Sequence, residues 1–441
     1  MKKDNTPWFW IPLLNFASGL PYAIIISVSV LMYKKLGIDN KSVGVYTSLF
    51  YLPWVIKPLW SPFIDLHGTK RKWFLSMQLI ISLAFLIIGF TIPLNNFLIL
   101  SLALFSIAAF ASASNDVATD GYYLLTLKPE EQSFFLGIRS TFYKLAGLTG
   151  SGLMVLFAGH LENKYNDNAK AWSYTMIFVG LIMAFVTIYN FFATPKTEEN
   201  SIISKNSIEH KSFTEVFATF FKKKQIGLVL AFILVFRLGE SQLLKMLNPF
   251  LVDPENVGGM GLQTEDVGII YGTLGITALT IGGILAGIAI SKYGLTKCML
   301  PMFLAMHLPI LGFVGLAHFQ PVEFFHFYLN LYFFEFDSNL NLYTSIVVII
   351  EQFGYGFGFT GFMMFLIHVA EGESKTSHYS LATGFMALGM MLPGMLSGYI
   401  QDYLGYQNFF IWVFIATIPG IILSRFLIFP KDFGKKSQEE V

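Results

Sequence analysis

The sequence is poor in cysteine and in charged residues. Cys298 is the single cysteine among 441 residues, so an intramolecular disulfide is excluded. Charged residues make up 13% of the chain, whereas an ordinary soluble domain contains about 25%. Hydrophobic residues make up 54% and aromatic residues 17%. This composition excludes an ordinary soluble protein and indicates a polytopic membrane protein.

Patterns typical of enzymes and nucleotide-driven pumps are also missing. The sequence has no Walker loop, no dinucleotide-type glycine pattern after a strand, no zinc-type Cys/His set and no Ser-His-Asp arrangement on soluble structure. We therefore expect no enzymatic activity, no metal and no cofactor. A proton or ion gradient is then the expected energy source, with a small-molecule substrate and the lipid bilayer as partners. Neither nucleic acid nor an obligate protein partner is expected.

Long apolar stretches dominate the chain. One crossing of a hydrocarbon core takes roughly 20 helical residues, and the stretches do not alternate as the strands of a membrane barrel would. The sequence therefore predicts an all-α membrane protein with twelve transmembrane helices, which we expect to form two six-helix pseudo-repeats. The predicted spans are residues 8–32, 43–64, 73–93, 97–127, 134–160, 172–193, 226–252, 267–290, 298–318, 344–369, 379–400 and 408–429.

The basic residues predict the topology. With both termini inside, 18 of the 29 Lys and Arg fall in inside segments and 5 in outside segments, so both termini are expected in the cytoplasm. No cleavable signal peptide is expected. The segment 324–336 is expected to lie in the membrane interface without forming a strand, and a short surface helix is expected over 212–224. The expected divisions are an N-terminal bundle 1–193, a cytoplasmic linker 194–225, a C-terminal bundle 226–430 and a cytoplasmic tail 431–441.

A short pattern recurs at the ends of spans. Ser61, Asp65 and Gly68 combine a small residue, an acid four positions on and a glycine three further. The same spacing recurs at Gly287, Ser291 and Gly294, and at Gly398, Asp402 and Gly405. An acidic group beside a tight glycine turn can hold a gate closed through ion pairs that break on switching, and an inverted repeat places the last copy on the outer side. The predicted gating residues are Lys57, Asp65, Arg71, Arg139, Lys144, Ser291 and Gly294.

Two carboxylates lie within one predicted span. Asp116 and Asp120 are four residues apart, so on a helix they project from one face, one turn apart. A carboxylate in a bilayer costs several kcal/mol, which calls for a lined cavity, a charge partner or a bound proton. A fixed pairing with Lys57 or Lys144 would satisfy these acids structurally, and a proton-carrying role would satisfy them functionally.

Two further spans carry ionisable residues. The seventh contains Arg237 and Glu240, three residues apart, and the tenth contains Glu351 followed by Gln352. The first two could neutralise each other, whereas Glu351 has no basic residue nearby in the sequence, which favours a proton-carrying role. This distribution indicates a polar path between two helix bundles.

Several segments resemble the AmpG-type muropeptide permeases, in the peptide/acetyl-CoA/drug transporter branch of the major facilitator superfamily. The segments are residues 15–21 (NFASGLP), 113–116 (ASND) with Asp120, 129–131 (PEE), 237–240 (RLGE), 351–354 (EQFG) and 397–399 (SGY) with Asp402. The resemblance implies proton-coupled import of anhydro-muropeptides, the GlcNAc-anhydroMurNAc fragments of peptidoglycan turnover. It also implies that Asp116 and Asp120 are acidic positions required for transport.

The candidate site residues follow from the intramembrane polar groups. The proton-coupling candidates are Asp116, Asp120, Glu240 and Glu351. The substrate-binding candidates are Asn15, Tyr22, Asn115, Arg237, Gln242, Lys245, Gln352 and Tyr355. Two alternatives stay open at this point: a facilitator for another solute, such as an oligosaccharide, a peptide or a siderophore, and a non-transporting membrane scaffold or sensor.

Overall fold

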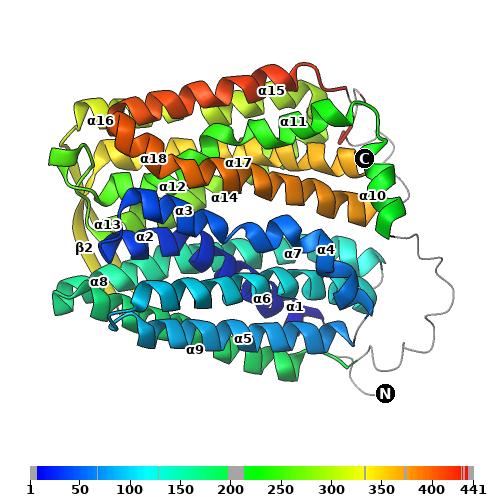
Figure 1. Ribbon diagram of the computed structural model, residues 1–441, viewed down its shortest axis with the longest axis horizontal. Helices are drawn as coiled ribbons and strands as arrows, with labels where there is room; N and C mark the ends of the chain where they lie inside the picture. The colour runs from blue at the N-terminus through cyan, green and yellow to red at the C-terminus, as the bar shows by residue number, and fades with distance from the viewer. Residues whose placement is uncertain are drawn as a thin grey trace.

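The computed structural model describes residues 7–66, 68–127, 129–196, 213–331, 334–371, 375–428, 430 and 433–435. These residues form a bundle of long helices that run side by side, with the N-terminal half in blue to cyan and the C-terminal half in green to red (Figure 1). The β-hairpin lies at one end of the bundle and α10 (Phe213–Phe221) at the other. We call these the hairpin end and the α10 end.

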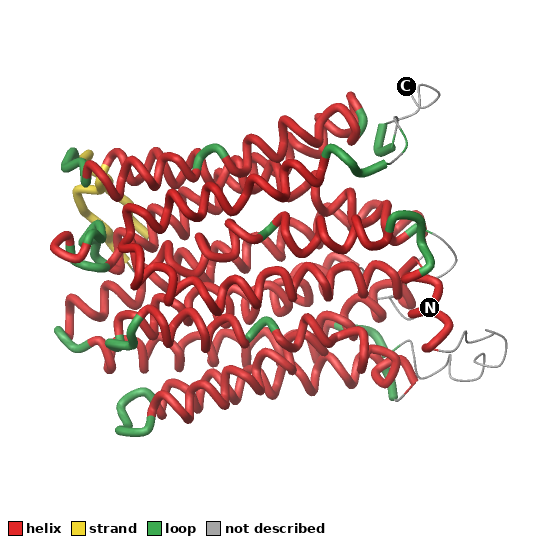
Figure 2. Tube along the Cα trace, turned by 45° about the horizontal axis from the view of Figure 1, so that its top comes forward, coloured by secondary structure: helices red, strands yellow, loops and turns green. Residues whose placement is uncertain are grey.

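Helices, drawn in red in Figure 2, make up most of the bundle, and the two strands, drawn in yellow, lie at one end. Among the described residues, three spans contain π-helical turns, labelled η1, η2 and η6. The N-terminal half consists of α1 (Pro7–Ala23), η1 (Ile24–Val28), α2 (Ser29–Lys35), α3 (Asn40–Leu49), α4 (Leu52–Leu66), α5 (Lys70–Thr91), α6 (Phe97–Thr126), α7 (Pro129–Leu148), η2 (Thr149–Met154), α8 (Val155–Tyr165) and α9 (Asn168–Ala193).

The C-terminal half repeats this arrangement and adds the hairpin. Within it, Phe232, Phe236 and Phe303 are fully buried and pack ring against ring. Its elements after α10 are α11 (Ile226–Phe236), α12 (Leu238–Val252), η5 (Glu255–Val257), α13 (Thr264–Val267), η6 (Gly268–Gly275), α14 (Ile276–Tyr293), α15 (Leu295–His307), α16 (Ile310–Phe319), β1 (Phe324–Leu331), β2 (Phe334–Asn341), α17 (Leu342–Ala370) and α18 (Lys375–Ser424).

The described residues contain ten helical stretches that are long and apolar enough to cross a membrane. Two features reconcile this number with the twelve predicted spans. The predicted span 43–64 is interrupted at residues 50–51 and divides into α3 and α4. The last two predicted spans both lie within α18, in which Gly405 interrupts the helical conformation. The all-helical transmembrane fold is therefore confirmed.

The recurring pattern found in the sequence has a common backbone conformation. Its three glycines, Gly68, Gly294 and Gly405, have φ values of +73°, +81° and +68°. A residue with a Cβ adopts such a left-handed conformation at a cost of roughly 1–2 kcal/mol. Each glycine ends a helix sharply, and the chain then enters the next span.

Within the segment 324–336, residues 324–331 and 334–336 lie in strands, so the prediction that the segment would not form a strand is wrong. Strands β1 and β2 pair antiparallel, with Phe325 opposite Leu340. Phe336 and Leu340 are buried against the bundle, whereas His326 and Asp337 are exposed and lie 2.7 Å apart. The alternation of buried and exposed side chains becomes visible only when both strands are considered, because β1 by itself is aromatic on both faces.

The helix predicted between the halves is present as α10, while residue 212 lies outside the described residues. The Phe220 ring is buried and stacks parallel to that of Phe385 in α18, with 6.4 Å between ring centroids. At the opposite end, the exposed Asp39 caps α3 by accepting a hydrogen bond from the Ser42 backbone N–H at 3.0 Å. This hydrogen bond to the carboxylate lowers the pKa of Asp39.

Candidate functional site

A cavity of about 230 Å³ lies between the two halves of the chain. The lining residues come from α1, η1, the α3–α4 break, α7 and η2 on one side, and from the α11–α12 junction, α12, η6, α14 and α17 on the other. They are Gly19, Tyr22, Ala23, Ile26, Ser27, Tyr51, Tyr143, Lys144, Gly147, Ser151, Arg237, Leu244, Lys245, Tyr271, Ile276, Leu279, Gln352 and Tyr355.

Five tyrosines give the cavity an aromatic wall. Tyr22, Tyr51 and Tyr143 come from the N-terminal half, and Tyr271 and Tyr355 from the C-terminal half. A tyrosine ring offers a flat apolar face together with a hydroxyl that donates and accepts hydrogen bonds. Such a wall suits a ring-shaped solute that also carries hydroxyl groups.

Three cationic side chains line the same cavity, and they differ in their partners. Arg237 forms an ion pair with Glu240, and its Nη2 also donates to the Tyr355 hydroxyl at 3.0 Å. The buried Lys245 ammonium donates to Thr47 Oγ1 at 3.1 Å. Among the residues that the structure describes, no carboxylate forms an ion pair with Lys144 or Lys245. The cavity wall therefore carries two ammonium groups whose charge no described acid neutralises.

The Lys245 ammonium also lies 5.2 Å from the centroid of the Tyr51 ring. A cation over an aromatic face is stabilised by roughly 0.5–2 kcal/mol, which is less than an ion pair in a water-poor site supplies. A positive charge on Lys245 would therefore have only weak partners in the protein, and an anionic group of a solute would stabilise it.

The candidate proton-carrying acids lie behind the cavity wall and do not line it. Glu351 is 2% exposed, and its Oε2 accepts a hydrogen bond from Gln352 Nε2 at 2.8 Å. Glu240, also buried, is held by Arg237. Each acid therefore contacts one residue of the cavity wall: Glu351 contacts Gln352, and Glu240 contacts Arg237.

The two acids of α6 have separate partners. Asp116 Oδ2 accepts a hydrogen bond from Trp54 Nε1 at 3.2 Å. The more exposed Asp120 forms an ion pair with Arg139, and the same guanidinium donates from Nε to Asn15 Oδ1 at 3.1 Å. One helical turn therefore separates an acid bound to a neutral donor from an acid bound to arginine.

The structure brings five of the eight predicted substrate-binding residues to the cavity. Those are Tyr22, Arg237, Lys245, Gln352 and Tyr355.

The other three do not line it. Asn115 is buried within the N-terminal half, where it donates to Ser18 at 2.9 Å and accepts from Gln78 at 3.1 Å. Gln242 accepts from Trp412 Nε1 at 2.9 Å, and Asn15 is engaged by Arg139. Their amides are satisfied by the protein itself.

The predicted gating residues are scattered. Arg71 is buried and donates to the Thr194 hydroxyl at 3.0 Å, within its own half. Lys144 lines the cavity, Lys57 is half-buried on α4, and Ser291 is exposed at the end of α14. Arg139 pairs with Asp120, and Gly294 follows the end of α14, as described above. The Asp65 side chain lies outside the described residues.

Polar contacts that sequence reasoning missed join the two halves at the hairpin end. Lys34 forms a 2.6 Å ion pair with Asp253, and the other oxygen of that carboxylate accepts from the Tyr406 hydroxyl at 2.6 Å. Lys41 pairs with Asp402 at 2.8 Å. The recurrence of Asp402 in the repeated pattern was a signal for its role, but the partner lysines, at the end of α2 and at the start of α3, belong to no pattern of their own.

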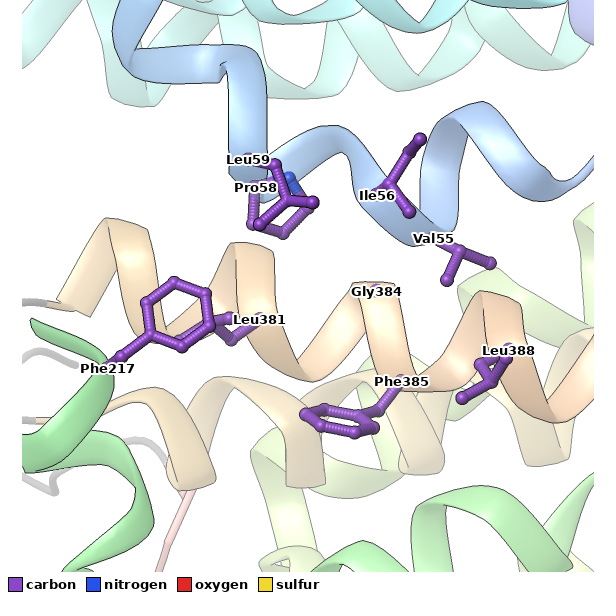
Figure 3. A pocket seen from close by; sticks show the side chains of 9 residues that line it. All are labelled: Val55, Ile56, Pro58, Leu59, Phe217, Leu381, Gly384, Phe385 and Leu388. Atoms are coloured by element: carbon purple, nitrogen blue, oxygen red, sulfur yellow. The ribbon is translucent and has the colours of Figure 1, made fainter. Parts of the chain in front are cut away.

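At the α10 end, the contact between α4 and α18 has a different chemistry. The two helices face each other across an apolar pocket of about 200 Å³ (Figure 3). Val55, Pro58 and Leu59 line it from α4, and Leu381 and Phe385 line it from α18. Polar contacts therefore join the halves at the hairpin end, while side chains without charge meet here.

A comparison with protein families identifies the superfamily of the chain. Residues 13–346 match the family model described as Major Facilitator Superfamily. The chain belongs to the Major Facilitator Superfamily. Members of this superfamily are membrane transporters, and the multi-pass helical architecture described above agrees with that membership.

Two relatives show how similar this chain is to transporters with names of their own. The anhydromuropeptide permease of Escherichia coli K12 is 24% identical over 420 residues, which cover 93% of this chain and 77% of the relative. A transporter of Rickettsia felis named AmpG 4 is 23% identical over 433 residues, covering 95% and 96%. The resemblance to AmpG-type transporters inferred from the motifs is therefore confirmed.

Solved structures of other superfamily transporters have the same fold. The D-xylose-proton symporter superposes with a TM-score of 0.73 at 9% identity, covering 97% of this chain and 98% of that one. The nucleoside transporter NupG superposes with a TM-score of 0.64 at 14% identity, covering 94% and 98%. At such identities the agreement establishes the architecture of the protein.

Proposed function

We propose that the protein imports anhydro-muropeptides, GlcNAc-anhydroMurNAc with or without peptide, into the bacterial cytoplasm by proton symport. The observation that carries the proposal is the central cavity, where five tyrosines surround the ammonium groups of Lys144 and Lys245. A solute with sugar rings and a carboxylate complements this combination of aromatic faces and unneutralised positive charge.

The chemistry of the cavity supports this solute class in three ways. Sugar rings pack on tyrosine faces, and Gln352 offers an amide to hydroxyl and acetamide groups. The lactyl carboxylate of an anhydromuramoyl sugar can pair with Lys245 or Lys144, and Arg237 lies on the same wall. The printed names of the relatives, an anhydromuropeptide permease and an AmpG transporter, point to the same solutes.

Proton coupling rests on the acids behind the wall. Glu351 is buried and is hydrogen-bonded to the neutral Gln352. An intramembrane carboxylate without a cationic partner is expected to hold a proton during part of its cycle. Glu351 is therefore our first candidate for the proton carrier, followed by Asp116, Glu240 and Asp120, of which the last two already have arginine partners.

The excess of basic residues in alternate loops supports an inner-membrane location with both termini in the cytoplasm. On that assignment the hairpin end faces the periplasm and the α10 end faces the cytoplasm. The ion pairs of Lys34 and Lys41 then close the periplasmic side. Import proceeds when these contacts break, the solute and a proton enter, and the two bundles rock about the cavity.

The test is uptake of labelled GlcNAc-anhydroMurNAc into proteoliposomes under an imposed inward proton gradient, with and without an uncoupler. Accumulation that the uncoupler abolishes is the expected result, and it also excludes a scaffold or sensor. Absence of uptake by folded, correctly oriented protein would overturn the proposed substrate. Related oligosaccharides, peptides and siderophores would then be screened in the same liposomes.

A further inference from the structure

One acid of α6 is linked to the cavity through two aromatic side chains. The Tyr22 ring lines the cavity, and its edge-to-face partner is Trp54, with 5.3 Å between ring centroids and 90° between ring planes. The indole Nε1 of Trp54 in turn donates to Asp116 Oδ2 at 3.2 Å. The path from cavity to carboxylate therefore contains two rings and one hydrogen bond.

The break between α3 and α4 places Trp54 in this position. The Trp54 backbone N–H donates to the Tyr51 carbonyl at 3.0 Å, which makes the first turn of α4. Tyr51 lines the cavity and lies under the Lys245 ammonium. A substrate group that engages Lys245 thus contacts the same short segment of chain that orients Trp54.

We propose that Trp54 is a positioning residue that couples occupancy of the central cavity to protonation of Asp116. A solute packed on Tyr22 constrains the ring against which Trp54 rests, and so sets how well the indole N–H meets the carboxylate. The N–H stabilises the charged form of the acid, because an ionised acceptor strengthens the bond. Solute and proton then influence each other's binding by the same factor, as thermodynamic linkage requires. This inference rests on the proposed proton coupling but not on the identity of the solute.

Groups on four helices, α1, α4, α6 and α7, also lie close enough to Asp116 to act on it. Ser18 on α1 forms a hydrogen bond with it, and Lys57 on α4 and Asp120 on α6 act on it through their charges. Tyr22 on α1 and Tyr143 on α7 lie within its electrostatic reach. Of these neighbours, Tyr22 and Tyr143 line the cavity, and Tyr22 also packs against the indole that donates to Asp116.

The chain offers a matched control for the indole N–H. Trp60 lies on the same helix, six residues further on, and its buried Nε1 has no hydrogen-bond partner among the described residues. Trp54→Phe and Trp60→Phe therefore make the same chemical change on one helix. Only the first removes a donor from an acid, so a general effect of the substitution on α4 would appear in both variants.

The first measurement compares two transport modes in proteoliposomes. Proton-driven accumulation requires coupling, whereas exchange of internal for external solute requires only that the loaded carrier reorient. A hydrogen bond to a charged group contributes about 1.5–3 kcal/mol, and each 1.4 kcal/mol corresponds to about a tenfold change. We expect Trp54→Phe to reduce accumulation about tenfold or more while exchange stays within about twofold. Trp60→Phe should change neither, and equal loss of both modes in Trp54→Phe would overturn the proposal.

The second measurement needs no solute. The carboxyl stretching band of the purified protein is followed by infrared spectroscopy during a pH titration, and the band missing from Asp116→Asn is assigned to Asp116. The proton affinity reported by this band is expected to change about tenfold in Trp54→Phe and to stay at the wild-type value in Trp60→Phe. An unchanged titration in Trp54→Phe would refute the role of Trp54 even if the proposed solute also failed. A changed titration without muropeptide uptake would instead refute the substrate alone.

Discussion

At the scale of single residues, the acids of this protein fall into two kinds. Glu240 and Asp120 are bound to arginines, whereas Glu351 and Asp116 are hydrogen-bonded to the neutral donors Gln352 and Trp54. An arginine neutralises a carboxylate permanently, because its guanidinium does not release its proton. A neutral donor leaves the acid free to alternate between its two protonation states.

Replacement of Glu351 by glutamine tests this distinction. The amide fits the same buried space but cannot release a proton, so proton-driven accumulation should fall to background while solute exchange persists. Both rates are measured in proteoliposomes with variant and wild type at equal density. Glu255→Gln, an exposed carboxylate in the loop before α13, is the control and should behave as wild type. Normal accumulation by the Glu351 variant would remove this residue from the coupling mechanism.

Replacement of Arg237 by glutamine should mainly lower the stability of the folded protein. It leaves the buried Glu240 carboxylate without its ion partner, and breaking a buried pair in this way costs about 3–5 kcal/mol. We expect a lower thermal unfolding temperature in detergent. The double variant Arg237→Gln with Glu240→Gln should recover most of that stability, because no buried charge is then left uncompensated. No recovery in the double variant would show that Arg237 stabilises the fold through its other contacts, such as Tyr355.

At the scale of elements, most of the helices could be predicted from the sequence, but the hairpin was missed. Hydropathy identifies spans because each must present apolar side chains to lipid over its whole length. Strands β1 and β2 depend on each other for their alternating pattern, so hydropathy over β1 alone does not detect them. The break at Tyr51 had a marker that the hydropathy reading passed over: Pro53 has no backbone N–H, so it cannot donate to the carbonyl of Leu49 and continue α3.

The residues that line the cavity also divide into those that were predicted from the sequence and those that were missed. Arg237, Lys245 and Gln352 were found because a polar side chain within an apolar span is unusual. Tyr51, Tyr143 and Tyr271 were missed, since tyrosine is common both in helix packing and at membrane interfaces. Nothing in the spacing of these tyrosines distinguishes a ring that faces the cavity from one that packs in the core.

The helix-ending glycines give a prediction at this scale. Gly294 has a φ of +81° and a ψ of +154°, a conformation essentially restricted to glycine, so Gly294→Ala should destabilise the protein by roughly 1–3 kcal/mol and lower its thermal unfolding temperature. Gly315 lies within α16, where an added Cβ meets no atom within 4 Å. Gly315→Ala should therefore be neutral or slightly stabilising. Equal unfolding temperatures for the two variants would mean that the left-handed conformation at Gly294 costs nothing.

At the scale of the whole molecule, the contacts between the halves are asymmetric. Ion pairs hold the hairpin end together, while an apolar pocket separates α4 from α18 at the α10 end (Figure 3). Salt bridges at a partly exposed surface contribute little individually, about 0–1 kcal/mol each. Such an end can open without a large energetic barrier, which an alternating-access transporter requires.

Asp253→Asn should therefore shift the protein towards a state open at the hairpin end, because it removes the charge that pairs with Lys34. A cysteine introduced at Ser27, which lines the cavity, reports this opening in a Cys298→Ser background. Labelling by a membrane-impermeant maleimide from the periplasmic side should become several-fold faster. The corresponding substitution of the exposed Asp337 in the hairpin is the control and should leave the rate unchanged. If Asp253→Asn labels no faster than the control, the ion pair does not hold this end closed.

The position of the acids behind the cavity wall has an evolutionary consequence. Tyr22, Gln352 and Arg237 line the cavity, whereas Asp116, Glu351 and Glu240 lie behind it, so in the proposed mechanism no acid contacts the solute. On that proposal, mutations at other wall positions, such as Tyr143 or Tyr271, would alter which molecule is carried without disturbing the acids proposed to exchange protons. A gene duplicate could acquire a new cargo through a few such changes and retain its dependence on the same energy source.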